Sequence, residues 1–485
     1  MSKIKYFLAI LLAFIISLPA SVYAVPDEPP GGFGGGPGGN DSSNVSYTGA
    51  NVISSDTTEL EKTYSSDSGN QNALLVSGGT STLNTCTINK TGDSDGDNSD
   101  FYGTNAAVLV YNGAILNLKN GTITTNGAHA NAVFAYGTGT INVEKTKIKT
   151  TGNNSGAIMV TGGGSLTANE VTAETSGNSS APIRSDRGGG NLTVNGGSFT
   201  SHGTGSPVIY STANIIVNNS NLISTASEGI VVEGKNSVTL NNTTLEATNN
   251  TLNGNSETYK TIFIYQSMSG DADVGTSSFT AKDSKITNNK GDVIFVTNTN
   301  TVITLENNEI INNDEEGCFI RATSSKWGNS GSNGGTVELN LTNQKVNGDV
   351  IIDSISSIAI NMKKGSILTG RIYNDYQGSE ISLSLSSDSI LSLTGDSYLK
   401  SLKNELSDNS NIYSNGYKLY VDGKEVKLNQ GTYTPSNEEK DISTNESKTN
   451  TNYIFYIIGG SSIFVIAIVI TIIVILKKKK NNINE

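Results

Sequence analysis

The sequence predicts an all-β fold, a right-handed parallel β-helix solenoid of about eleven coils. Three observations support this prediction. Similar segments recur about every 25 residues, each segment holds three short strand-like pieces, and glycine, asparagine and serine separate the pieces. The composition agrees, with 53 glycines, 8 prolines and 16% charged residues in a chain of 485. It excludes coiled coils, which need far more charge, and collagen, which needs a strict glycine triplet.

One repeat unit illustrates the predicted coil. The unit from Asn105 begins with an apolar piece, continues with an alternating triplet at 116–118 and ends with a threonine-rich piece at 122–124. A single unit cannot bury its apolar side chains, whereas stacked coils share one continuous core. An array of β-sandwiches is the alternative, but its units would be roughly 100 residues long.

The N-terminal part of the chain precedes the repeats. Residues 1–24 predict a secretory signal peptide, because lysines precede an apolar run and Ala24 ends a suitable cleavage site. An uncleaved membrane anchor is the alternative. Residues 25–70 predict a Gly/Pro-rich linker and an irregular N-terminal cap. The β-helix repeats are expected over 71–378.

The regular repeat ends well before the C-terminus. Residues 379–435 predict a C-terminal β cap, in which Asp422 and Gly423 form the turn of a hairpin. This hairpin would cover the last open strand edge. Residues 436–453 are polar and poor in apolar side chains, so we expect a stalk there.

The C-terminal segment predicts a membrane anchor. Residues 454–476 carry no charge, and a helix of that length spans the roughly 30 Å hydrocarbon core. The tail 477–485 begins with four lysines, which mark the cytoplasmic side. We therefore expect a single-pass type I protein of the cell membrane, with its ectodomain outside the cell and the membrane as one partner.

Charge and cysteine content limit the possible partners. The net charge is −12, and because both ends are positive the ectodomain is more acidic still. An acidic ectodomain argues against nucleic acid as a partner. Cys86 and Cys318 lie far apart and follow the apolar rhythm of their segments, which favours buried packing over a disulfide bridge.

The densest charge cluster on a coil contains Arg184, Asp186 and Arg187, ahead of three glycines. In a polysaccharide lyase an arginine can serve as the base beside calcium-bound acids. A contact point for an anion or a glycan is a second interpretation. An exposed turn with internal ion pairs is the third.

An acidic loop is the candidate metal site. Asp93, Asp95, Asp97 and Asp100 offer alternate carboxylates, and calcium prefers six to eight oxygen ligands. The spacing does not match an EF-hand, and a solvated insertion loop is the alternative. Asp271 and Asp273 form a smaller cluster of the same kind.

Aromatic side chains could contact a ligand or pack inside. Trp327 lies in a glycine-rich loop, where it could stack on a sugar or anchor the loop on the coils. The aromatic residues of the first strand-like pieces favour an internal stack over a ligand ladder. These residues are Phe134, Tyr136, Tyr210, Phe263, Tyr265, Phe295 and Phe319.

The units resemble the right-handed parallel β-helix superfamily that includes pectate lyases and many surface adhesins. The phrases APIRSDRGGG (181–190), YQSMSGDADVG (265–275) and LTGDSYLKSL (393–402) resemble those of microbial cell-surface β-helix proteins called adhesin-like. A longer phrase over 332–356 does the same, and the resemblance covers roughly 65–430. It implies the fold and a surface location, and it carries over no catalytic residue.

Location, fold and the lack of a catalytic set favour an adhesin-like protein that binds glycans or other surfaces through a polar, Asn/Thr-rich face. A calcium-dependent surface polysaccharide lyase and a passive structural coat protein are the alternatives. Whether the protein is an enzyme stays open, although the lack of a catalytic set of residues argues against an enzyme.

Overall fold

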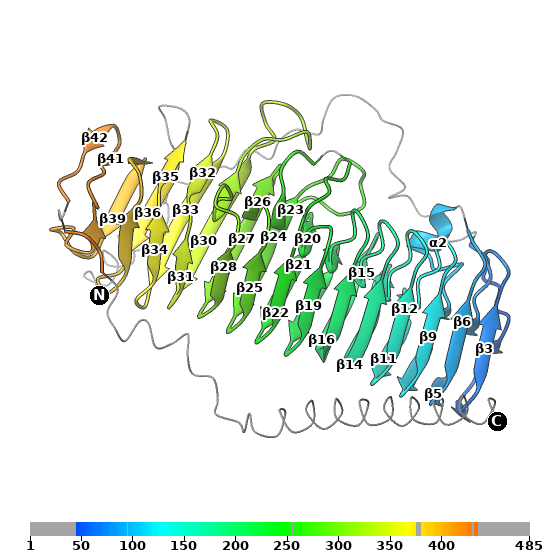
Figure 1. The fold of residues 1–485 in the computed structure, drawn as a ribbon. Helices are drawn as coiled ribbons and strands as arrows, with labels where there is room; N and C mark the ends of the chain where they lie inside the picture. Colours follow the sequence, from blue (N-terminus) through cyan, green and yellow to red (C-terminus); the bar gives the residue numbers. More distant parts are fainter. Residues whose placement is uncertain (1–44, 95, 255, 375–379, 429–430, 435–485) are drawn as a thin grey trace, which may run out of the picture. The chain divides into compact units, whose positions relative to one another are not determined.

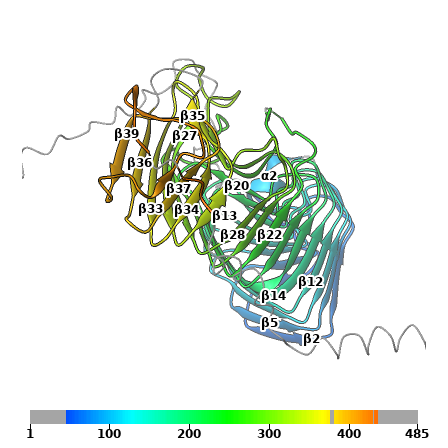
Figure 2. The ribbon, with the colours of Figure 1, turned by 60° about the vertical axis from the view of Figure 1, so that its left-hand side comes forward.

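A computed structural model describes residues 45–94, 96–254, 256–374, 380–428 and 431–434. The chain divides into two compact units, Met1–Gly431 and Thr432–Glu485. All of the described strands belong to the first unit, where they form a right-handed parallel β-solenoid of about 14 coils (Figures 1 and 2). The predicted all-β parallel solenoid is therefore confirmed, whereas its number of coils differs from the prediction.

Successive coils, from β1 to β35, contribute one strand each to a thirteen-stranded sheet. In order along the stack, the strands are β1 (Val52–Ile53), β4 (Leu74–Val76), β7 (Val108–Val110), β10 (Val133–Tyr136), β13 (Ile158–Thr161), β15 (Ile183–Ser185), β17 (Ile209–Ser211), β20 (Ile230–Glu233), β23 (Lys260–Tyr265), β26 (Asp292–Thr297), β29 (Ile320–Ala322), β32 (Val350–Ile352) and β35 (Ile372–Asn374).

Most of the remaining strand-like pieces form a twenty-two-stranded sheet. Its strands are β2 (Thr57–Leu60), β3 (Thr63–Ser66), β5 (Thr80–Asn84), β6 (Thr87–Lys90), β8 (Ile115–Lys119), β9 (Thr122–Thr125), β11 (Thr140–Glu144), β12 (Lys147–Thr150), β14 (Gly164–Thr175), β16 (Gly190–Ser201), β18 (Asn214–Asn218), β19 (Asn221–Ser224), β21 (Ser237–Asn241), β22 (Thr244–Ala247), β24 (Thr276–Lys282), β25 (Lys285–Asn288), β27 (Thr299–Glu306), β28 (Glu309–Asn312), β30 (Gly335–Thr342), β33 (Ser357–Lys363), β36 (Ile381–Leu385) and β39 (Ser401–Asn404).

Two small sheets complete the C-terminal coils. They contain β31 (Lys345–Asn347), β34 (Ile367–Gly370), β37 (Ile390–Leu393) and β40 (Ile412–Tyr413), and then β38 (Ser397–Leu399), β41 (Leu419–Val421) and β42 (Lys424–Glu425). The β41–β42 pair is antiparallel, with Asp422 and Gly423 between the strands. The predicted hairpin is thus present.

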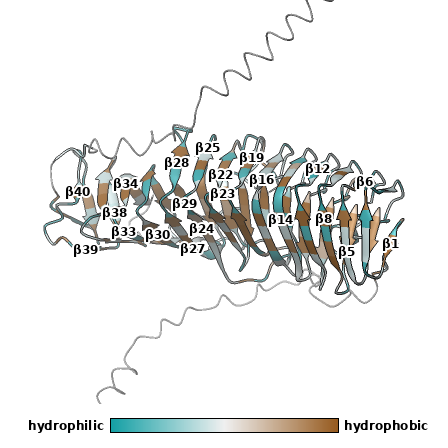
Figure 3. Ribbon diagram, turned by 90° about the horizontal axis from the view of Figure 1, so that it is seen from below, coloured by the Kyte–Doolittle hydropathy of each residue, from teal (hydrophilic) through white to brown (hydrophobic). Residues whose placement is uncertain are grey.

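In-register stacking builds the core. Ile141, Leu166, Leu192 and Ile215 occupy equivalent positions of successive coils, and all four are buried. Along β11 buried side chains alternate with partly exposed ones, as a strand with one face inside requires. Figure 3 shows the same alternation as brown and teal along the strands.

The thirteen-stranded sheet departs from this alternation, because β7, β13, β23 and β26 are buried along their whole length. Their inward side chains join the core. Their outward side chains lie in separate clusters with tyrosines and Trp327. Inserted segments at 91–107, 248–259, 266–275 and 323–334 accompany this sheet. The first contains α2 (Asp97–Phe101), which lies above the strands in Figure 1.

The stack is longer than the predicted eleven coils. It begins with β1, β2 and β3, inside the segment that we expected to be an irregular cap. It also continues through β36 to β41 beyond residue 378. The repeat is hard to recognise in the first coil because β2 and β3 carry few apolar side chains, such as Leu60 and Tyr64.

Four predicted segments lie outside the described residues, namely the signal peptide (1–24), the stalk (436–453), the membrane helix (454–476) and the tail (477–485). Within the described part of the chain, no helix is long and apolar enough to cross a membrane.

Candidate functional site

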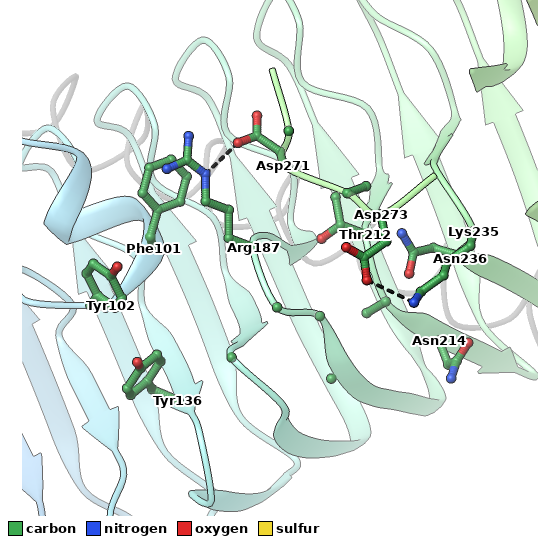
Figure 4. A pocket seen from close by; sticks show the side chains of 17 residues that line it. Phe101, Tyr102, Tyr136, Arg187, Thr212, Asn214, Lys235, Asn236, Asp271 and Asp273 are labelled. Atoms are coloured by element: carbon green, nitrogen blue, oxygen red, sulfur yellow. Dashed lines mark hydrogen bonds and ion pairs between the residues drawn. The ribbon is translucent and has the colours of Figure 1, made fainter. Parts of the chain in front are cut away.

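A groove crosses five successive coils of the described solenoid. Its floor consists of the turns that follow β13, β15, β17 and β20, and its walls are the loop 266–275 and the α2 segment with Tyr136 at the end of β10 (Figure 4). Its volume is about 530 Å³. It is lined by Phe101, Tyr102, Tyr136, Gly162, Arg187, Gly188, Gly189, Gly190, Thr212, Ala213, Asn214, Lys235, Asn236, Gly270, Asp271, Ala272 and Asp273.

Small residues keep the floor of this groove low. Gly188 has a φ of +77°, and a Cβ there would lie 2.8 Å from the Cα of Gly162 on the coil below. No other residue fits that contact without moving the backbone. The glycine run after Arg187 therefore gives a shallow turn, above which a ligand has room.

Arg187 joins three segments at one end of the groove. Its guanidinium lies 3.7 Å from the centroid of the Phe101 ring, at the end of α2. Its Nε donates to Oδ1 of Asp271 at 2.6 Å, in the loop 266–275. The cation–π contact and the ion pair hold the side chain over the groove floor, with 23% of it exposed.

Arg184 and Asp186 lie beneath the surface and do not line the groove. Arg184 donates to Asp186 at 3.0 Å and lies 3.9 Å from Asp100, which also pairs with His129 at 2.8 Å. Burial raises the pKa of Asp186 to about 6, partly opposed by Arg184. Of the predicted arginine cluster, Arg187 alone reaches the groove, and the other two residues attach the α2 segment to the coils.

Polar side chains line the other end of the groove. Lys235 pairs with Asp273 at 2.8 Å, and its backbone nitrogen donates to the Asp273 carbonyl. Thr212, Asn214 and Asn236 lie close by (Figure 4). Thr212 is 3% exposed and its hydroxyl donates to Oγ of Ser185. The amides of Asn214 and Asn236 are therefore the groups that can exchange hydrogen bonds with the hydroxyls of a ligand.

A buried carboxylate anchors the loop 266–275. Glu233, 1% exposed, accepts hydrogen bonds from the hydroxyls of Tyr210, Tyr265 and Ser267. Burial raises the pKa of Glu233 above its usual value. Ser267 belongs to the loop, so this network fixes the loop's base, while Asp271 and Asp273 fix its far part.

Aromatic rings form the wall opposite this loop. Tyr102 and Tyr136 meet edge to face, with 5.6 Å between the ring centroids. Together with Phe101 they give the groove a partly apolar side. Sequence reasoning missed Phe101, Tyr102, Lys235 and Asn236 as groove residues. The signal in the sequence that pointed to these residues was the longer spacing between repeat units near positions 100 and 270.

Trp327 lies elsewhere, beside Tyr265, with 4.8 Å between the ring centroids. It packs against a cluster formed by Val231, Phe263, Tyr265 and Phe295. This position fits the interpretation of Trp327 as a loop anchor, and it lies outside the groove. Phe263 and Phe295 also stack on each other, as an internal aromatic stack predicts.

The carboxylates of the acidic loop make contacts with the protein. Asp93 accepts from the backbone nitrogen of Ala128 at 2.7 Å, and Asp100 pairs with His129 and Arg184. Asp95 and the side chain of Asp97 lie outside the described part of the structure. Among the described residues no three His, Cys, Asp or Glu side chains gather in a possible metal site. Calcium binding by this loop stays a prediction.

Both cysteines are buried and free. Cys86 packs in the main core, and the Cys318 thiol lies 2.9 Å from Oδ1 of Asp292. The packing interpretation of the two cysteines is confirmed.

Comparison of the chain with family models, curated proteins and solved structures finds no match. The assignment of the fold therefore depends on the observed strand pairing, and no similar protein suggests a role for the groove.

Proposed function

We propose that this chain is a membrane-anchored cell-surface β-helix that binds saccharides in the groove over the turns after β13 to β20. In this role it would be adhesin-like and attach the cell to glycans of other cells or matrix. The groove carries the proposal, because it combines aromatic rings with hydroxyl, amide and charged side chains along five coils.

The chemistry of the lining supports a saccharide. Sugar rings have apolar faces that stack on aromatic side chains and hydroxyls that exchange hydrogen bonds with amides. Tyr102 and Tyr136 supply the first kind of contact and Asn214 and Asn236 the second. A cavity of about 530 Å³ lies within the range of small-ligand sites, and its open length suits an oligosaccharide.

The proposed location has a separate basis. The apolar segment 454–476 with its following lysines, and the apolar run within 1–24, support an anchored protein with an exterior solenoid. The resemblance to surface β-helix proteins agrees with this location.

A glycan array tests the proposal. The full chain, kept in a polyoxyethylene detergent that contains no sugar, should bind a subset of oligosaccharides. Tyr102→Ala should weaken that binding by roughly tenfold, the range of a lost stacking contact. Tyr417→Ala is the matched control, because Tyr417 is 44% exposed in the C-terminal coils, away from the groove.

Two results would contradict the proposal. One is an array without binding. The other is binding that Tyr102→Ala and Tyr417→Ala change equally. Release of unsaturated products from uronate polysaccharides in calcium would instead support the lyase alternative.

A further inference from the structure

The charges of the groove cancel in pairs. Among the described residues that line it, Arg187 and Lys235 are the cationic ones, and Asp271 and Asp273 are the anionic ones. The two pairs have N–O distances of 2.6 and 2.8 Å. Both aspartates belong to the loop 266–275, so one loop neutralises both cations of the floor.

We propose that the groove selects uncharged saccharides and that Asp271 and Asp273 exclude acidic ones. This inference rests on the proposed function and adds the class of ligand. The aspartates neutralise the two cations that would otherwise attract the carboxylates of an acidic sugar. An acidic ligand would either share a cation with an aspartate of the same sign as itself, or displace the aspartate from its charge-assisted hydrogen bond.

The Arg187 pair is especially hard to displace. Its guanidinium is held over the ring of Phe101 at 3.7 Å, and its side chain and that of Asp271 are 23% and 21% exposed. An ion pair so shielded from water is screened less than an exposed one. A ligand carboxylate that replaced Asp271 would also leave that aspartate without its partner.

Uncharged ligands meet no such obstacle. Asn214 and Asn236 offer amide groups, and Tyr102 and Tyr136 offer rings, without any ion pair being broken. The net charge of −12 acts in the same direction, because it repels anionic saccharides as they approach.

A glycan array with paired ligands tests the inference on the full chain in the same sugar-free detergent. Each uronate-containing oligosaccharide is printed beside its methyl ester, which keeps the sugar and removes the charge. At low ionic strength the neutral sugars and the esters should bind about tenfold or more tightly than the free acids. Binding of the neutral sugars should not change with added salt.

The double variant Asp271→Asn/Asp273→Asn tests the cause. It leaves Arg187 and Lys235 unpaired, so binding of the free acids should rise by about tenfold and become salt-sensitive. Asp283→Asn is the control for the loss of a carboxylate elsewhere. It removes one negative charge from the turn after β24, where other coils carry asparagine, and it should leave both ligand classes unchanged.

The outcomes separate the two proposals. Tighter binding of the free acids than of their esters by the wild-type chain would overturn the selectivity while leaving saccharide binding in place. A folded double variant that gains no acid binding would overturn the role of the aspartates. If no saccharide binds, the proposed function fails and this inference fails with it.

Discussion

At the scale of single residues, stacked coils decide which charges are tolerated. Equivalent positions of neighbouring coils lie side by side, so like charges would repel and unlike charges attract. Lys282 pairs in register with Glu306 at 3.1 Å, and Lys285 with Glu309 at 3.0 Å. This rule explains the low charge content, whereas the groove is neutralised by ion pairs between its floor and the inserted loop 266–275.

Asp186 should make stability depend on pH. Its pKa is raised from 3.8 to about 6 by burial, so folding favours the protonated form. The stabilisation by protonation is fully present below about pH 4 and is lost as the pH rises through 6. The full effect is roughly 3 kcal/mol.

Asp186→Asn removes this titration while keeping the size of the side chain. The unfolding temperature of the wild type, measured relative to that of the variant, should therefore rise as the pH falls from 7 to 4. A difference that stays constant over this range would show that Asp186 does not titrate as described.

At the scale of the element, one turn recurs in almost every coil. In eleven coils the residue after the second strand-like piece has a φ between 46° and 57°, and in the β16 coil it is Gly196 with a φ of 73°. The eleven residues are Glu61, Thr85, Asn120, Lys145, Glu170, Asn219, Asn242, Asp283, Asn307, Asn343 and Lys364. Asparagine tolerates this left-handed conformation best among residues with a side chain, which explains its abundance here.

Lys145 tests the turn, since its φ is 47° and its two ion pairs, at 3.9 and 3.7 Å, are exposed. Lys145→Val should lower the free energy of unfolding by about 1–2 kcal/mol, because a β-branched side chain is strained there. Lys145→Asn should leave it nearly unchanged, as Asn120 occupies the same turn one coil earlier. Chemical denaturation measures both variants, and equal stabilities would refute the conformational explanation.

The sequence predicted the elements better than it predicted the groove. Repeats with apolar side chains at fixed spacing, such as Leu116 and Ile141, identify coils because burial depends on local alternation. The groove depends on which insertions meet across coils. Arg187 contacts Asp271, 84 positions away, and no local pattern encodes that distance. The sequence placed the candidate site at Arg184, Asp186 and Arg187, which is the right region of the chain. It did not predict that Arg187 alone of the three lines the groove.

At the scale of the whole molecule, the chain contains a polar solenoid, and its C-terminal part is predicted to be a membrane anchor. The solenoid presents the groove on one side of its thirteen-stranded sheet. The anchor is predicted from the hydropathy of 454–476 and the lysines that follow. Adhesion to a second surface needs both parts, because a binding site that is released from the cell cannot hold it.

Truncation before Ile454 tests the anchor. Cells that express the shortened chain should release it into the medium, whereas the full chain should stay with the membrane fraction. Immunoblots of the two fractions measure this, with Lys477→Gln as a control that keeps the apolar segment. Retention of the truncated chain in the membrane fraction would contradict a single C-terminal anchor.

The central claim is that the groove binds a saccharide. Hydrogen–deuterium exchange of the full chain, with and without the best oligosaccharide from the array, tests it most directly. The account predicts slower exchange in the α2 segment, in the turn after Arg187 and in the loop 266–275, with the remaining coils unchanged. Protection confined to the twenty-two-stranded sheet, or no protection anywhere under saturating ligand, would contradict it.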